Sequence, residues 1–422
     1  MGTIYKALKV RLYPNATQQE GLNKTLGSSR ALYNMMLYER SQVYDAWKES
    51  GEDKTVLYKH KYKTEKEYKQ EYEWLKEADS IALQQSRVDL SNSYSNFFKS
   101  LKGQRKGAKV GFPKFKKKRN GSSYRTMNVN NNILIDFEAK KVKLPKLGWI
   151  SFRDHRDEFE GEIKSATVSR TATGKYFVSM LFKQELSLEG VELSDGLKTK
   201  TIGLDMSLEH FFVDDKGQSP AYERVYRKYE PKLKKAQRNM SKKKKGSKNW
   251  YKALHKVSLV HEKITNKRKD FTQKLSTELV RNYDVIVVEH LSLKGMSQAL
   301  NLGKSVMDLG YSQFVHQLNY KSLWNNKVFI QADKWFASSK TCSICGFKKT
   351  DLLLSDREWK CPNCGTFHDR DQNAGMNLKN YGLNELGLGQ PEYTPVESKT
   401  SASALVGVSL DTEAGRSFVL SE

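Results

Sequence analysis

The sequence predicts a multidomain protein in which an α+β region is followed by an α/β domain. Its 422 residues are enough for about two to four domains. In the first half, a strand with alternating side chains precedes a helical segment and then a block of short strands. In the second half, apolar strands alternate with helices, as in α/β domains.

The first half is expected to contain one strand, a helical bundle and a small β-barrel. Residues 6–13 alternate apolar and basic side chains, as in a half-buried strand. Helical periodicity follows Pro14 and begins again near Trp74, and the charged residues 50–73 between them are expected to form a helix or loop. Five short strands follow between residues 132 and 182. The simplest geometry lets the first strand rejoin them, which makes the bundle an insertion.

The second half is expected to form the α/β domain. Residues 199–206 and 210–215 are predicted to be adjacent strands, and the apolar run 284–291 is typical of a strand buried on both faces. Beyond residue 386 the chain is rich in Gly, Ser and Thr and is expected to be disordered. The remaining predicted elements are a basic helical region at 226–283, a helix at 313–324, a strand at 327–335 and a helix at 371–382.

The charge of the chain is strongly positive and uneven. Its 73 Lys and Arg exceed its 48 Asp and Glu by 25, and residues 381–422 carry a net charge of −4, so the first 380 residues carry +29. A field of this size favours binding to nucleic acids through release of counterions. A merely basic surface, as on ribosomal proteins, is the alternative, although the 38% hydrophobic content indicates folded domains with cores.

No apolar leader or membrane span is apparent. The first 14 residues lack an apolar signal region, and no run approaches the roughly 18 apolar residues that a membrane span needs. We therefore expect an intracellular, cytoplasmic protein without a membrane partner, in a compartment where disulfides are rare. All four cysteines lie between Cys342 and Cys364, so metal binding is the leading explanation for them.

The four cysteines have the spacing of a zinc ribbon. Cys342 and Cys345 form one C-x2-C pair, and Cys361 and Cys364 form a second pair after fifteen residues. Four thiolates complete the tetrahedral coordination of a structural Zn²⁺, whereas four free thiols are the less favoured alternative. His368 is therefore not expected to be a ligand, and the zinc has no open position for catalysis.

Three acids stand at the ends of predicted elements. Asp205 lies near the end of one strand, Glu289 ends the apolar strand, and Asp371 begins the last helix. Each alone could be a strand-end residue or a helix cap. Together they match the metal-site arrangement of RNase H-like nucleases. At a separation of about 4 Å each pair would repel by ~4 kcal/mol, so we expect two Mg²⁺ ions to hold them.

Helical periodicity favours Asp371 over Asp369 as the third acid. Ala374 and Leu378 follow Asp371 by three and seven residues, on the same helix face, and should pack toward the sheet. Asp369 points elsewhere or precedes the helix. We therefore expect Asp371 to be the metal ligand and Asp369 to be a bystander.

Several segments together resemble the TnpB family, transposon-encoded relatives of type V CRISPR effector nucleases. The resemblance extends over nearly the whole chain to about residue 380. The segments are GLDMS (203–207), VVEHLSLKGM (287–296), SSKTCSICG (338–346) and CPNCGTFHDRDQNA (361–374), with KALKVRLYPN (6–15), VGFPKFKKKR (110–119) and SYRTMNVNNN (123–132) in support.

The resemblance implies a specific domain order. It comprises a wedge β-barrel, an inserted helical recognition domain, an RNase H-like (RuvC) nuclease domain and a zinc ribbon inserted into that domain. The implied bounds are 1–14 and 115–196 for the wedge, 15–114 for recognition, 197–336 and 367–386 for the nuclease, 337–366 for the ribbon and 387–422 for the tail.

The resemblance also implies an RNA-guided DNA endonuclease that needs Mg²⁺. Such a protein binds a guide RNA from the transposon end and cuts double-stranded DNA beside a short flanking motif, while the guide pairs with one strand. Asp205, Glu289 and Asp371 are then the RuvC acids. We expect a monomer within the ribonucleoprotein, acting at a prokaryotic nucleoid. A nuclease-silent RNA-guided repressor and an RNase H-like transposase are the alternatives, and the intact acids argue against the repressor.

The sequence indicates candidate residues for nucleic-acid contacts, but it assigns their roles less specifically than those of the acids and cysteines. Gln84 and Asn130 carry amides of the kind that contact adenine edges, although a solvated helix face or turn is an equal alternative. Arg370 and Asn373 lie beside Asp371 without an assigned role. Two basic runs are expected to hold the RNA or heteroduplex backbone, with a solvated loop as the alternative. Their residues are Lys114, Lys116, Lys117, Lys118, Arg119, Lys242, Lys243, Lys244 and Lys245.

Overall fold

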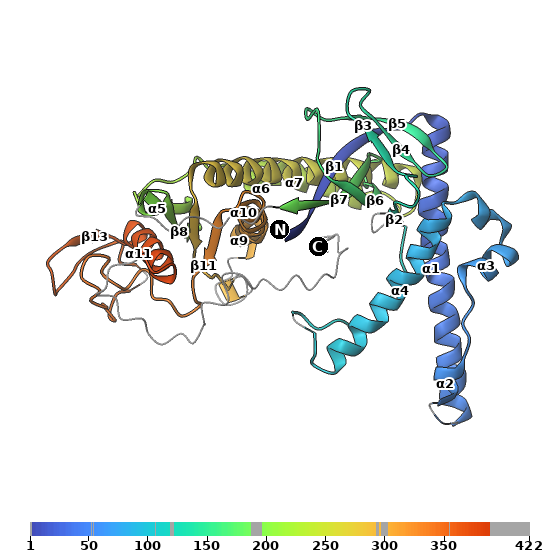
Figure 1. Ribbon diagram of the computed structural model, residues 1–422, viewed down its shortest axis with the longest axis horizontal. Helices are drawn as coiled ribbons and strands as arrows, with labels where there is room; N and C mark the ends of the chain where they lie inside the picture. Colours follow the sequence, from blue (N-terminus) through green and yellow to red (C-terminus); the bar gives the residue numbers. More distant parts are fainter. Residues whose placement is uncertain are drawn as a thin grey trace. The chain divides into compact units, whose positions relative to one another are not determined.

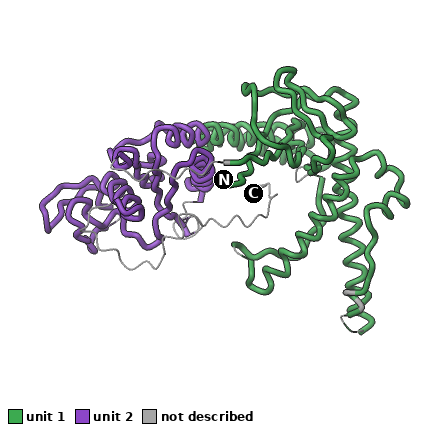
Figure 2. Tube along the Cα trace, viewed as in Figure 1, with its two compact units in different colours: residues 1–190, 224–270 green, residues 191–223, 271–422 purple. Residues whose placement is uncertain are grey.

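The computed structural model describes two compact units of the chain (Figure 2). The first comprises residues 1–190 and 224–270, and the second comprises residues 191–223 and 271–422. Arg119 and the predicted tail beyond Leu388 lie outside the described residues. None of the described helices combines the length and low polarity needed to cross a lipid bilayer. The residues described are 2–51, 53, 55–105, 107–118, 122–186, 196–292, 295–296, 303–353 and 355–388.

An antiparallel sheet of seven strands forms the core of the first unit (Figure 1). The strand order is β2-β6-β7-β1-β5-β4-β3. β1 pairs with both β7 and β5, so the first strand rejoins the later block as predicted and the helices between are an insertion. The strands are β1 (Gly2–Tyr13), β2 (Ser122–Met127), β3 (Leu134–Asp136), β4 (Lys141–Leu144), β5 (Gly148–Arg153), β6 (Glu162–Arg170) and β7 (Tyr176–Leu186).

The predicted barrel is not closed by hydrogen bonds within the described strands. β2 and β3 are the two edges, and the sheet curls around a single apolar cluster instead. Leu8, Val10 and Leu12 point into this cluster, as the alternation in the first strand predicts. The sequence prediction missed β2, because Tyr124 is the one large apolar side chain that it buries there.

The helical insertion has two long helices. Asn15 caps α1 (Ala16–Ser50) in a capping box with Gln18. The second long helix, α4 (Ser80–Leu101), begins later than predicted because Asp79 caps it, accepting a hydrogen bond of 2.9 Å from Ile81 N. Trp74 lies instead in a 3₁₀ turn. The shorter elements are α2 (Thr55–Lys59), α3 (Glu65–Glu71) and η1 (Glu73–Glu77).

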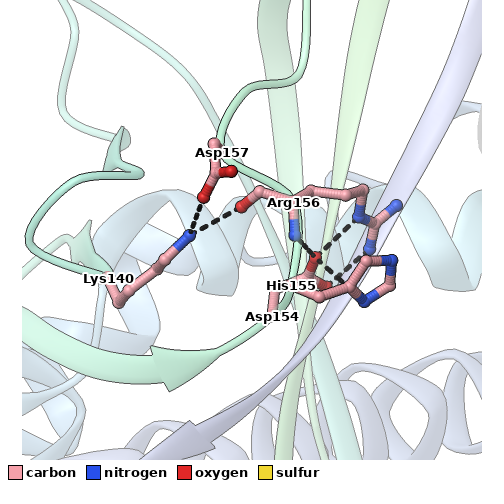
Figure 3. A network of polar contacts seen from close by, with 5 residues as sticks. All are labelled: Lys140, Asp154, His155, Arg156 and Asp157. Atoms are coloured by element: carbon pink, nitrogen blue, oxygen red, sulfur yellow. Dashed lines mark hydrogen bonds and ion pairs between the residues drawn. The ribbon is translucent and has the colours of Figure 1, made fainter.

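A network of polar contacts fixes the loop between β5 and β6 (Figure 3). Both carboxylate oxygens of Asp154 accept hydrogen bonds of 2.7 Å from the Arg156 guanidinium. Lys140 Nζ donates to Arg156 O at 2.7 Å and to Asp157 Oδ1 at 3.0 Å. The bonds from Arg156 lower the pKa of Asp154. The loop is therefore tied to the turn that precedes β4.

Two basic helices complete the first unit and lead into the second. α6 (Val225–Ser241) packs on the first part of α7 (Lys248–Asn282) through a small apolar cluster. Val225 and Leu233 of α6 meet Val257, Val260 and Ile264 of α7. The loop between the helices carries the predicted basic run from Lys242 onward.

The second unit contains a sheet of four strands in the order β11-β10-β8-β9. β8 and β9 are antiparallel, whereas β8, β10 and β11 are parallel to one another. The apolar run at 284–291 supplies β10, whose four residues are all buried, as predicted. The elements are α5 (Gly196–Thr199), β8 (Thr201–Ser207), β9 (Phe211–Asp214), β10 (Val285–Val288), α9 (Gly303–Leu309), α10 (Tyr311–Trp324), β11 (Val328–Gln331) and α11 (Arg370–Glu385).

The cysteine segment precedes α11 and contains a small hairpin. β12 (Glu358–Lys360) and β13 (Phe367–Asp369) pair antiparallel. β13 continues without a break into α11, so the end of the cysteine segment is also the start of the helix that carries Asp371. The bounds that the resemblance implies for the wedge, recognition, nuclease and ribbon domains stay a prediction.

Candidate active site and metal centre

Close backbone packing holds α11 against the sheet beside Asp205. A Cβ on Gly203 would lie 2.1 Å from Gly375 O, and one on Gly375 would lie 2.7 Å from the backbone carbon of Asp214. Both distances are shorter than real contacts. The two glycines thus let the helix backbone touch β8 and the end of β9, which brings the first turn of α11 to the strand that carries Asp205.

Gly203→Ala is expected to lower the melting temperature strongly and to reduce any activity of the site. The new methyl meets backbone atoms, which cannot move as a side-chain end can, so the cost is about 1–3 kcal/mol or more. Thermal unfolding of both variants measures it. Gly27→Ala in α1 is the matched control, because a Cβ there meets nothing within 4 Å. Equal melting temperatures for Gly203→Ala and the unchanged protein would contradict the packing argument.

Asp205 lies near the end of β8 and Glu289 directly follows β10, and the parallel register of the two strands places them next to each other. Both side chains are half-buried. Burial, followed by the charges of Glu289 and Asp371, raises the pKa of Asp205 well above its usual value. Burial also raises the pKa of Glu289. Two such carboxyls cannot both be ionised cheaply without a cation.

Asp371 lies beside this pair in the first turn of α11. Its charge acts on Asp205, and Arg357 Nη1 is 3.7 Å from its Oδ1. Among the described residues, only the four cysteines have ligand atoms that all lie within 4.8 Å of one another, and the carboxylates of the three acids do not form such a group. The structure thus places the three predicted acids in one neighbourhood, while their role as magnesium ligands stays a prediction.

Asp369 is the N-cap of α11. Its side chain accepts a hydrogen bond of 2.9 Å from Gln372 N. Ala374 and Leu378 are fully buried, as the periodicity from Asp371 predicts. Asp369 thus precedes the helix, as expected, and caps the helix that carries Asp371. That Asp369 is not a metal ligand stays a prediction.

Arg370 connects the acids to the cysteine segment. Its positive charge opposes the rise in the pKa of Asp205 and of Glu289. Its Nη1 also donates a hydrogen bond of 2.8 Å to Leu353 O. The Arg370 guanidinium therefore offsets part of the negative charge of Asp205 and Glu289, and its hydrogen bond to Leu353 O anchors it to the cysteine segment.

Tyr311, which sequence reasoning missed, fixes the turn after Asp205. Its hydroxyl donates to Phe211 O at 2.9 Å and also contacts Ser207 O. Phe211 has a φ of 74°, a strained value for a side chain of its size. Nothing in the local sequence around Tyr311 indicated this contact, since its partners are about a hundred residues away.

The four cysteines form a group that could hold a metal ion. Their sulfur atoms all lie within 4.8 Å of one another, and Cys342 to Cys364 and Cys345 to Cys361 are each 3.6 Å apart. A tetrahedral Zn²⁺ with Zn–S bonds of about 2.3 Å needs sulfurs about 3.8 Å apart. The arrangement therefore fits a structural zinc.

His368 contacts Cys342 without belonging to the group of four. Its Nε2 is 3.0 Å from Cys342 Sγ, and its ring centre is 4.7 Å from that of Trp359. Burial lowers the pKa of His368. The ring thus lies against the sulfur as a neighbour that can orient it.

The predicted nucleic-acid contacts lie on the first unit. Gln84 is exposed on α4, and Asn130 is exposed in a turn with a φ of 52°. Lys116 has structural partners, because its Nζ lies 4.2 Å from the ring centre of Tyr33 and 3.2 Å from Asp89. The other described lysines of the two runs are exposed, namely Lys114, Lys117, Lys118, Lys242, Lys243, Lys244 and Lys245.

Comparison with known families identifies three segments of the chain. Residues 188–300 match OrfB_IS605, described as "Probable transposase", and residues 311–378 match the TNB domain of Cas12f1-like proteins. Residues 1–49 match the "Helix-turn-helix domain" of the OrfB_IS605 group. In the structure this last segment is β1 followed by a single long helix.

A protein of Streptomyces pristinaespiralis extends the match to nearly the full length. It is named "Putative RNA-guided DNA endonuclease" and is 33% identical over 392 residues, which cover 91% of this chain and 90% of the relative. The chain belongs to the TnpB (OrfB_IS605) family. This confirms the resemblance found in the sequence. An Escherichia coli K12 member, "Putative RNA-guided DNA endonuclease InsQ", is 28% identical over 91% of this chain and 94% of its own.

A solved structure shares the fold of this TnpB family member. In the cryo-EM structure of a Cas12f1–sgRNA–target DNA complex, the Cas12f1 chain aligns with a TM-score of 0.52 at 13% identity. The alignment covers 89% of this chain and 99% of that one. The multidomain α/β fold with a curled sheet and a TNB domain is therefore common to both.

Proposed function

We propose that this protein is an RNA-guided DNA endonuclease that cuts double-stranded DNA beside a short flanking motif. The proposal depends mainly on the position of Asp205 next to Glu289, beside Asp371, toward the carboxyl ends of the parallel strands β8 and β10. The near full-length similarity to relatives named as RNA-guided DNA endonucleases supports it. The three acids form the catalytic centre of an RNase H-like (RuvC) domain.

The acids present oxygen ligands of the kind that Mg²⁺ takes in proteins. Two Mg²⁺ ions bound by these acids would supply an activated water and charge stabilisation for the leaving 3′-oxygen of the cut strand. Asp205, Glu289 and Asp371 would hold these ions, and the charges of Glu289 and Asp371, which raise the pKa of Asp205, are the repulsion that cations would relieve. Arg370 offsets part of the remaining negative charge.

The four cysteines hold Zn²⁺ as a structural ion. Because four thiolates complete the tetrahedron, the zinc has no position for water or substrate. The zinc ribbon therefore shapes the protein, and the acids carry out the chemistry.

The exposed lysines on the first unit hold the guide RNA and its duplex with target DNA. Phosphate contacts of this kind position a nucleic acid without reading its sequence. The guide reads the target by base pairing, and the wedge and recognition domains read the flanking motif. Gln84 and Asn130 are candidates for that contact, since an amide can bind an adenine edge. One protein molecule binds one guide RNA.

The function is tested by producing the protein together with its transposon-end RNA. Sequencing of RNA that co-purifies should give one defined species. The complex should then cut a plasmid that carries a guide-matched target beside a randomised flank, with Mg²⁺ and not with EDTA. A purified protein without specific RNA, or one that binds the target and never cuts it, would overturn the proposal.

The description of the OrfB_IS605 family as a transposase favours a second candidate, a DNA-strand transferase. RNase H-like acids can serve strand transfer as well as hydrolysis. The same plasmid assay separates the two, because strand transfer gives joined DNA products and needs no RNA. Cut ends that appear only with the guide would exclude it.

A further inference from the structure

Two asparagines of α11 hold the first cysteine turn of the ribbon. Asn373 Oδ1 accepts a hydrogen bond of 3.0 Å from Ser343 N, and Asn373 Nδ2 donates one of 2.7 Å to Thr341 O. Asn377 Nδ2 donates to Thr341 O at 2.6 Å and to Ser338 O at 2.7 Å. We call Asn373 and Asn377 the asparagine clamp.

The clamp is buried and specific. Asn373 and Asn377 are each only 2% exposed, and they lie one turn apart on the same face of α11. A buried amide is costly unless its hydrogen bonds are made. Here the side chains bind backbone groups of the ribbon, so their hydrogen bonds favour the observed register of the helix against the ribbon.

The clamp grips the backbone on both sides of a zinc ligand. Thr341 and Ser343 are the residues immediately before and after Cys342. At the other end, Asn373 lies two residues after Asp371, in the same turn of the helix. Cys342 and Asp371 are therefore connected through the Asn373 side chain and a few backbone atoms.

The second cysteine turn reaches the same helix end. β13 continues directly into α11, and Arg370 N donates a hydrogen bond of 2.8 Å to Arg357 O beside β12. His368 of β13 also touches Cys342 Sγ, as described above. The start of α11 is thus held by both halves of the ribbon.

We infer that Asn373 and Asn377 are positioning residues through which the folded zinc ribbon sets the place of Asp371. This inference rests on the proposed function, in which Asp371 is a magnesium ligand. The ribbon then acts as a brace for the nuclease centre, and the state of the zinc site is transmitted to the acids through the clamp.

Asn373→Ala and Asn377→Ala are expected to separate zinc binding from cleavage. Both variants keep four thiolates, so each should retain a full complement of zinc and bind RNA and target DNA normally. Loss of a side chain that orients a metal ligand typically costs about 10–100-fold. We expect the cleavage rate to fall by this factor and the Mg²⁺ concentration for half-maximal rate to rise, since the misplaced acid weakens the ion site.

Asn380→Ala is the matched control. It removes an amide from the same helix, at a half-buried position outside the clamp. Its zinc content, cleavage rate and Mg²⁺ requirement should match those of the unchanged protein. Wild-type rates and Mg²⁺ requirements in both clamp variants would refute the inference.

Hydrogen exchange of the RNA-free protein tests the clamp without using cleavage. In the unchanged protein, backbone amides at 371–377 should lose protection when a chelator removes zinc. In Asn373→Ala they should lose it while zinc is still bound. Continued protection in both cases would refute the clamp whatever the nuclease does. Alternatively, the amides lose protection as expected while the unchanged protein never cuts DNA. In that case the proposed function is wrong, and the role of Asn373 and Asn377 in connecting the ribbon to α11 is still supported.

Discussion

Asp371→Ala is expected to abolish DNA cleavage while guide RNA and target DNA stay bound. The acid lies beside the Asp205–Glu289 pair, and its loss removes one of the three oxygen donors proposed for the ions. The cleavage rate should fall by about 10³-fold or more, because charge stabilisation in such a site is a large part of the rate. Single-turnover cleavage measures the loss, and binding assays without divalent ions measure RNA and DNA affinity.

Asp369→Ala provides the comparison within the same four-residue stretch. It removes the N-cap of α11, which costs about 1 kcal/mol of helix stability, and leaves all three acids in place. Cleavage should persist at a somewhat reduced rate, with a lower melting temperature. An active Asp371→Ala together with an inactive Asp369→Ala would reverse the assignment of the third acid.

The acids could be located from the sequence because each lies near one end of a predicted strand or helix. The apolar run at 284–291 ends at Glu289, and its strand β10 lies parallel to β8. The carboxyl ends of parallel strands meet at one edge of a sheet, so Asp205 and Glu289 had to come close. Helical periodicity then selected Asp371, since Ala374 and Leu378 had to face the sheet.

The contacts between elements could not be predicted in the same way. Asn373 and Asn377 have partners 30 to 39 residues away, and no local pattern encodes such pairing. Gly375 did carry a local signal, because a glycine inside a helical pattern often marks a close approach. Whether the outer strands β2 and β3 pair to close a barrel depends on how strongly the whole sheet curls. The periodicity of single strands does not specify that curvature.

Cys342→Ser is expected to remove the zinc, unfold the ribbon and stop cleavage. The sulfur is fully buried, and the serine hydroxyl is a poor replacement for a thiolate. Because binding free energy of a structural zinc is folding free energy, on the order of 10 kcal/mol, residues 337–366 should become sensitive to protease. Zinc analysis and limited proteolysis check this directly, and the guide RNA should still bind.

Ser343→Ala separates the loss of zinc from a change in the turn itself. It keeps all four thiolates and the backbone N–H that Asn373 binds, so zinc and cleavage should both be retained. If Cys342→Ser lost its zinc and still cut DNA at the unchanged rate, the ribbon would not support the nuclease centre. If instead cleavage fell with zinc, the loss would follow from geometry: the peptide groups on either side of Cys342 are the ones that hold the helix of Asp371.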